Sequence, residues 1–173
     1  EVQDDADMDR FAKLGVIANF TPYWNAGDPK VASSWLGEER AEKQLRCKTI
    51  WDSGALVTWS SDNVAYSDFV TWSPFLGMEV GMTRKITDKS RAPEHIRSNE
   101  VFPPDERMGI EEMLLGYTIN GAIQLGIEDH KGSITAGKDA DFLVFENDLL
   151  TAEKEGFSYN EPADVYFCGR KIN

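Results

Sequence analysis

Cysteine and histidine are scarce in this sequence, which contains two of each among its 173 residues. Cys47 and Cys168 lie far apart without a C-x-x-C pattern, which argues against both a disulfide framework and a cysteine zinc site. So few cysteines favour a reducing compartment, and we expect a cytoplasmic protein. His95 lies in a polar run and His130 in EDHKG, where a solvated surface residue is the first interpretation and a metal ligand the alternative.

Long apolar runs and basic clusters are also missing. No run approaches the roughly 20 apolar residues that cross a bilayer, and no signal peptide precedes the first predicted helix. The formal net charge is −12, and no basic stripe is present to neutralise phosphate, so nucleic acid is not expected as a partner. The chain opens on Glu1 and Val2 instead of methionine, which suggests a processed product, a recombinant piece or part of a longer protein.

The sequence that is present predicts a globular α/β protein, since 41% of the residues are hydrophobic and 11% aromatic. Residues 55–59, ALVTW, read as a strand buried on both faces, and residues 43–54 read as the helix that leads into it. In α/β folds, reactive groups gather at the carboxyl ends of strands. Asp62 follows such an end. It is either a turn residue or helix N-cap, or a carboxylate that binds a metal ion or accepts a proton from metal-bound water.

Apolar spacing and turn residues predict the other elements. The expected elements are a helix over 4–14, a strand over 16–20, a loop over 23–37, a long irregular segment over 64–107 with a short helix at 75–83, two short helices within 109–127, and strands at 140–146 and 163–167. Gly169 and Arg170 are expected to form a turn before residues 171–173. The last two strands do not alternate with helices. They are therefore expected to form a separate β-rich layer.

Aromatic residues are concentrated in the two long loops. Each loop follows a predicted strand, so these side chains either line a substrate pocket or pack against neighbouring loops. The candidates for a substrate wall are Tyr23, Trp24, Trp35, Tyr66 and Trp72.

Four phrases occur in an order that resembles a known family. They are WSSDN, TWSPFLGMEVGMTR, EEMLLGYTINGAIQLGIEDHKGSITAGKDADFLVFENDLLT and ADVYFCGRKI. Together they resemble the carboxyl-terminal part of the metal-dependent amidohydrolases, most closely amidohydrolase family 3, the YtcJ-like or exoenzyme-regulatory-protein-like branch. The phrase G-S-I-x-x-G-K-D-A-D-F-x-V is the strongest signal, and the similarity extends from about Met8 to Ile172.

The resemblance implies a (β/α)8 barrel with one or two divalent ions, usually zinc, at its mouth. The eighth barrel strand of the family ends in an aspartate, and Asp62 in S-S-D matches it. Its implied role is to ligate the metal, accept the proton of the attacking water and pass it to the leaving group. The implied fold is a C-terminal fragment containing barrel strands seven and eight in residues 1–130, and part of a small β-sandwich in residues 131–173. The parent enzyme would hydrolyse the C–N bond of an amide or cyclic amide.

The chain departs from the family pattern in its metal ligands. The family's H-x-H pair, its bridging lysine or other carboxylate and its later histidines would precede Glu1, and a catalytic zinc needs about three protein ligands. We therefore expect the fragment to be inactive and metal-free. Its expected partners are the missing N-terminal part of the barrel, a small-molecule amide in the full-length enzyme, and another copy through unpaired strands. The alternatives are a non-catalytic structural or interaction module, and a complete small enzyme that uses Asp62 with His95 or His130.

Overall fold

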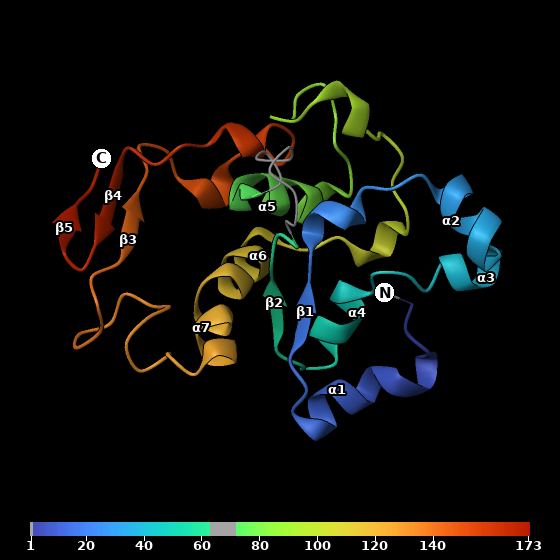
Figure 1. Cartoon of the computed structure of the whole chain (residues 1–173), viewed down its shortest axis with the longest axis horizontal. Coiled ribbons are helices and arrows are strands. Elements are labelled where there is room, and N and C mark those ends of the chain that lie inside the picture. The colour runs from blue at the N-terminus through green and yellow to red at the C-terminus, as the bar shows by residue number, and fades with distance from the viewer. Residues whose placement is uncertain (1, 63–71) are drawn as a thin grey trace.

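The protein is described by a computed structural model that covers residues 2–62 and 72–173 (Figure 1). Its fold is mixed α/β, as the sequence predicts. The helices are α1 (Met8–Leu14), α2 (Pro29–Leu36), α3 (Glu38–Ala41), α4 (Cys47–Asp52), α5 (Pro74–Thr83), α6 (Ile110–Tyr117) and α7 (Ile119–Leu125). The strands are β1 (Ala18–Phe20), β2 (Val57–Trp59), β3 (Phe142–Val144), β4 (Asp164–Phe167) and β5 (Arg170–Lys171).

The described strands form two sheets. β1 and β2 pair in parallel, with Ala18 opposite Val57 and Phe20 opposite Trp59. β3, β4 and β5 form an antiparallel sheet in that order, at the end of the molecule farthest from α2 and α3 (Figure 1). The separate layer predicted for the tail is therefore confirmed.

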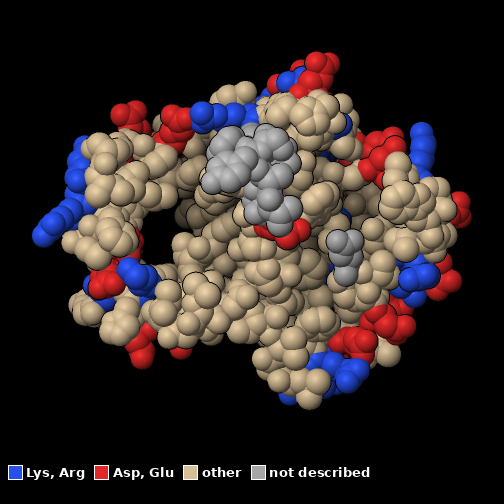
Figure 2. Space-filling model, in the orientation of Figure 1, with Lys and Arg blue, Asp and Glu red and all other residues tan. Residues whose placement is uncertain are grey.

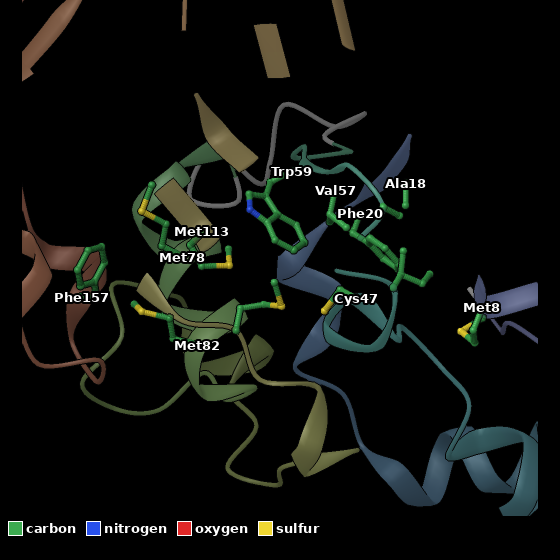
Figure 3. Close-up of a cluster of buried hydrophobic side chains, with 13 residues drawn as sticks. Met8, Ala18, Phe20, Cys47, Val57, Trp59, Met78, Met82, Met113 and Phe157 are labelled. Carbon is green, nitrogen blue, oxygen red and sulfur yellow. The ribbon is translucent and has the colours of Figure 1, made fainter. Parts of the chain in front are cut away.

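The main core lies between the parallel sheet and the helices that cover one of its faces (Figure 3). All three residues of β2 are buried, as expected for a strand of a covered parallel sheet. The buried members of this cluster are Met8, Ala18, Phe20, Cys47, Ile50, Ala55, Val57, Trp59, Met78, Met82, Met108, Met113 and Phe157. Trp59 also donates its indole N–H to the carbonyl oxygen of Glu112 at 3.3 Å, which ties β2 to α6.

Two predictions on the first half of the chain need correction. The helix predicted over 43–54 begins only at Cys47, because Leu45 has a left-handed φ of 49° that a helix cannot contain; its end before Gly54 is confirmed. The segment 23–37 is not a loop, since it contains α2. The Asp28 side chain caps this helix by accepting the N–H of Lys30 at 2.8 Å, and Pro29 occupies the first turn.

Helix α5 confirms the short helix predicted at 75–83 and carries its two glycines for a packing reason. A Cβ atom on Gly77 would lie 2.0 Å from the hydroxyl oxygen of Tyr117, and one on Gly81 would lie 2.5 Å from Met113. The glycines let α6 approach α5 closely, and the same burial raises the pKa of the Tyr117 phenol.

The pair α6 and α7 confirms the prediction of two short helices within 109–127. The break falls at Thr118, whose φ of −119° and ψ of −97° interrupt the helical path. Gly126 then ends α7 in the left-handed conformation, with a φ of 68°.

A buried carboxylate on α5 connects distant segments. Glu79 is 1% exposed; one of its oxygens accepts the hydroxyl of Ser90, and the other accepts the N–H of Ser158 at 2.8 Å. The Ser158 hydroxyl in turn accepts the N–H of Arg91 at 2.7 Å. These bonds hold the segments around residues 90 and 158 against α5.

A cleft of about 970 Å³ lies between the antiparallel sheet and α6–α7. In Figure 2 it is visible as a hollow beside the C-terminal sheet, and the charged side chains on this face lie mostly along the periphery of the molecule. On the sheet side, Lys131 forms ion pairs with Asp139 and Asp141, and the two carboxylates raise its pKa.

Among the described residues, no helix is both long and apolar enough to cross a membrane.

Candidate functional site

The carboxyl ends of β1 and β2 lie side by side and carry the candidate site. Ser60, the residue after β2, donates its backbone N–H to the carbonyl oxygen of Phe20 at 2.8 Å. This bond keeps the carboxyl ends of the two strands in register. Asp62 follows two residues later and is exposed. The predicted position of Asp62 beyond the end of a buried parallel strand is therefore what the structure shows.

Asp62 has a left-handed backbone, with a φ of 44°. Aspartate tolerates this conformation better than most residues. Asp62 and Trp24 line one groove of about 350 Å³ that runs along β1. The other described residues of this groove are Gln3, Phe11, Ile17, Ala18, Asn19, Phe20, Thr21 and Leu45.

Polar side chains cover the sheet face opposite the core. Asn19 donates to the Thr58 hydroxyl at 2.9 Å and accepts the Ser60 hydroxyl at 2.8 Å. The Ser60 hydroxyl also lies 3.3 Å from that of Thr21, and the Thr58 hydroxyl donates to Gln124 of α7 at 2.6 Å. We call these five side chains the polar ladder. It joins both strands immediately before the segment that carries Asp62.

The described residues do not fit a complete metal site. Among residues 2–62 and 72–173, no group of three histidine, cysteine, aspartate or glutamate side chains is placed to hold an ion. Asp62 can supply one ligand, and a catalytic zinc needs about three from the protein. His95 and His130 are both exposed, and neither lines the groove around Asp62.

The aromatic residues suggested by the sequence do not all lie at this groove. Trp24 lines it and is 54% exposed, and its ring makes an edge contact with Tyr23 at 5.4 Å between centroids. Tyr23 packs against a second cluster around α5 and is not among the groove residues. Trp35 is 84% exposed on α2, and Trp72 is 49% exposed. Tyr66 lies outside the described residues.

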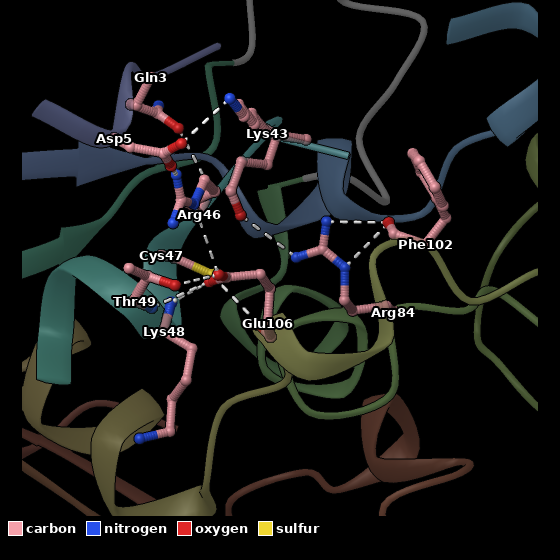
Figure 4. Close-up of polar contacts among 11 residues, drawn as sticks. Gln3, Asp5, Lys43, Arg46, Cys47, Lys48, Thr49, Arg84, Phe102 and Glu106 are labelled. Carbon is pink, nitrogen blue, oxygen red and sulfur yellow. Dashed lines mark hydrogen bonds and ion pairs between the residues drawn. The ribbon is translucent and has the colours of Figure 1, made fainter. Parts of the chain in front are cut away.

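A buried carboxylate that sequence reasoning missed stabilises the helix behind the site (Figure 4). Glu106 is 6% exposed, and its carboxylate accepts the N–H of Lys48 at 2.8 Å and that of Thr49 at 3.0 Å. It also accepts the Thr49 hydroxyl and lies 4.0 Å from the Arg46 guanidinium. The carboxylate thus satisfies the first N–H groups of α4, which packs on both β1 and β2.

Two further buried groups lie near Glu106. The Cys47 thiol donates to the Glu106 carbonyl oxygen at 3.5 Å, and burial raises its pKa to about 11. The Arg84 guanidinium donates twice to the Phe102 carbonyl oxygen, at 3.0 and 3.1 Å, and once to that of Leu45 at 3.4 Å. Burial lowers the pKa of Arg84 from its ordinary value. Its bonds fix the segment at Leu45 that leads into α4.

Comparison with known proteins connects this geometry to a family. Over 148 residues the chain is 26% identical to the YtcJ amidohydrolase of Bacillus subtilis, which covers 86% of this chain and 26% of the relative. Over 140 residues it is 31% identical to an N-substituted formamide deformylase of Arthrobacter pascens, covering 80% of this chain and 23% of the relative. The chain therefore spans about a quarter of the curated relatives it matches.

A solved structure shares the fold. An uncharacterised metal-dependent hydrolase from Pyrococcus furiosus superimposes with a TM-score of 0.57 at 21% identity, over 80% of this chain and 25% of that one. The model of the Amidohydrolase family matches residues 1–172, nearly the whole sequence. This chain belongs to the amidohydrolase family.

Proposed function

We propose that the chain is the C-terminal fragment of a cytoplasmic metal-dependent hydrolase that cleaves C–N bonds in amides or cyclic amides. Residues 1–130 would form the last two strands and helices of a (β/α)8 barrel, and residues 131–173 the closing part of a small β-sandwich. The observation that carries the proposal is the position of Asp62 at the carboxyl ends of two parallel strands, in one groove with Trp24. Functional groups of barrel enzymes gather at that end.

In this proposal Asp62 moves a proton. Its carboxylate accepts a proton from the water that attacks the carbonyl carbon and returns it to the departing nitrogen. An exposed carboxylate on a left-handed turn can reach a substrate in the groove. Through Ser60, the polar ladder holds the end of β2 against β1 and so helps to position the segment that carries Asp62.

The remaining parts of the site have to come from elsewhere. A divalent ion in the full-length enzyme, zinc in our proposal, would take its other ligands from outside the described residues, because these offer Asp62 alone at the groove. Trp24 would provide an apolar wall for a small-molecule amide, with Tyr23 behind it. Tyr66 and Trp72 remain candidates for the same wall. The fragment alone is expected to be inactive.

The second candidate function is a non-catalytic structural or interaction module. It is favoured by one observation, the absence of a three-ligand group among the described residues. It predicts that no complementing polypeptide restores hydrolysis.

The test uses the chain co-expressed with the part of B. subtilis YtcJ that lies outside its match to this chain. Hydrolysis of an N-substituted formamide, in the presence of zinc, is compared for wild type, Asp62→Asn and the control Asp52→Asn. Asp52 pairs with Lys48 on the surface and does not line the groove. We expect activity from wild type and the control, and a loss of at least about 100-fold for Asp62→Asn. Equal activity with and without the Asp62 carboxylate would refute its assigned role, and no activity in any sample would favour the module.

A further inference from the structure

The Arg84 guanidinium is a buried cation without a counter-ion in the described part of the chain. Arg84 is 1% exposed, and no described carboxylate oxygen lies within 4.0 Å of its nitrogen atoms. The Cys47 thiol is close to the guanidinium but stays neutral at ordinary pH, because burial raises the pKa of this thiol to about 11. A buried, unpaired charge is costly, so this position favours an anionic ligand.

Arg84 also has hydrogen-bond donors to spare. Of the five N–H groups of a guanidinium, three donate here to the carbonyl oxygens of Phe102 and Leu45 (Figure 4). These bonds hold the planar group in one orientation. The other two N–H groups have no oxygen acceptor among residues 2–62 and 72–173.

Asn25 adds an acceptor that lacks a donor. Asn25 is 2% exposed, and its amide nitrogen donates to the Cys47 sulfur at 3.8 Å. Its Oδ1 atom has no hydrogen-bond partner within the described ranges. An unpaired buried acceptor costs free energy, which the O–H or N–H of a ligand would recover.

A cavity of about 50 Å³ has both Arg84 and Asn25 in its wall. These two lining residues are buried, whereas Trp24, Gly27 and Asp28 are exposed and mark the opening. One water molecule needs about 10–15 Å³ of such space, so the cavity has room for about four non-hydrogen atoms. A ligand enclosed here is therefore small.

We propose that this cavity binds a small planar oxyanion that retains one proton, of which hydrogencarbonate is the simplest. Two of its oxygen atoms accept the remaining N–H groups of Arg84, and its hydroxyl donates to Oδ1 of Asn25. A plain carboxylate such as formate satisfies Arg84 and leaves Asn25 without a donor.

The cavity adjoins the groove that carries Asp62. Trp24 and Leu45 line both of them, so a ligand in the cavity contacts residues that also form the wall of the groove. The inference stands apart from the proposed function, because binding of the oxyanion requires neither Asp62 nor hydrolysis.

The test titrates the full chain with sodium hydrogencarbonate at pH 8 and, separately, with sodium formate. Sodium chloride keeps the ionic strength constant, and isothermal titration calorimetry measures both affinities. We expect saturable binding of hydrogencarbonate that is at least about tenfold tighter than that of formate, because formate has no proton to donate to Asn25.

Two variants change the charge of the cavity in opposite directions. Asn25→Asp places a carboxylate of the same shape in the wall that contains Arg84, and it should weaken hydrogencarbonate binding at least about tenfold. The control Asp28→Asn keeps a good helix cap and removes a negative charge at the opening, so it should bind at least as tightly as wild type. Far-UV circular dichroism and thermal melting show whether both variants fold.

Three results would overturn the inference: no saturable binding of hydrogencarbonate, equal affinities for hydrogencarbonate and formate, or undiminished binding by folded Asn25→Asp. The comparison of the two anions needs only wild type, so it decides the matter should Asn25→Asp not fold. Selective binding of hydrogencarbonate by a chain that gives no hydrolysis with the YtcJ segment would support the cavity and count against the proposed function alone.

Discussion

The N–H of Lys48 donates to the carboxylate of Glu106 at 2.8 Å across a sequence separation of 58 residues. A helix as short as α4 gains little stability from its own backbone bonds, so its first N–H groups need partners from elsewhere. Glu106 provides them from the short 3-10 helix η5 (Pro104–Glu106), and in this way it links η5 to the helix behind β1 and β2.

Glu106→Ala should lower the free energy of unfolding by about 3 kcal/mol, because it leaves two helix N–H groups and the Thr49 hydroxyl without their acceptor. Urea denaturation measures the effect. The control is Glu39→Ala, whose side chain is 87% exposed and whose loss should cost less than about 0.5 kcal/mol. Equal stability of the two variants would mean that α4 does not depend on this carboxylate.

Gly77→Ala should destabilise the protein by about 2 kcal/mol, since the new Cβ atom would lie 2.0 Å from the Tyr117 hydroxyl oxygen. Tyr117→Phe removes that oxygen and should recover part of the loss, giving a coupling of about 1 kcal/mol in a double-mutant cycle. Gly27→Ala is the matched control, because no atom lies within 4 Å of its Cβ position. Additive effects would show that α5 and α6 do not meet at Gly77.

Cys47 should be unreactive towards a thiol reagent at pH 8, whereas the exposed Cys168 reacts. Burial raises the Cys47 pKa from 9.0 to about 11, so its contribution to stability is complete below pH 9 and is lost as the pH rises towards 11. Titration with the reagent on wild type and Cys168→Ser checks the first point. Unfolding measured from pH 8 to 11 on wild type and Cys47→Ala checks the second, and identical pH slopes would contradict it.

The isolated chain should retain far less than one equivalent of zinc after dialysis, because one carboxylate at the groove binds an ion weakly. Elemental analysis with light scattering on the same sample measures metal content and mass together. A stoichiometric ion in a monomer would contradict the fragment interpretation and favour the complete small enzyme. A stoichiometric ion found only in a dimer would show that two chains share ligands.

The sequence predicted what local patterns determine. The apolar runs around Val57 and Ala18 identified both parallel strands, and the position of Asp62 followed from them. Helix α2 is not predicted because its segment is rich in glycine, proline and serine, which favour a loop, although α2 is amphipathic and Asp28 followed by Pro29 is a helix start signal. Tyr23 and Trp24 both lie in the short 3-10 helix η2 (Pro22–Asn25). The path of η2 decides which of the two rings lines the groove, and Tyr23 packs on the second cluster instead.

Contacts between distant residues could not be predicted in the same way. Glu106 is one of the two acidic residues in PPDER, and no neighbouring residue in the sequence indicates that its carboxylate reaches α4. The hydrogen bond from the Asn120 side chain to the Val57 carbonyl oxygen is equally hidden from the sequence, since Asn120 follows the helix break at Thr118. Such interactions arise from the tertiary arrangement, which single-sequence patterns do not contain.

The buried carboxylate of Glu79 has a consequence for the order of synthesis. Ser90 leaves the ribosome soon after α5, but Ser158 follows 79 residues behind Glu79. Until then, α5 contains an acidic side chain that lacks one of its two partners and cannot be sealed from water without cost. The packing of α5 therefore depends on the last quarter of the chain, and in a chain truncated before residue 158 we expect Glu79 to keep water in place of the Ser158 N–H.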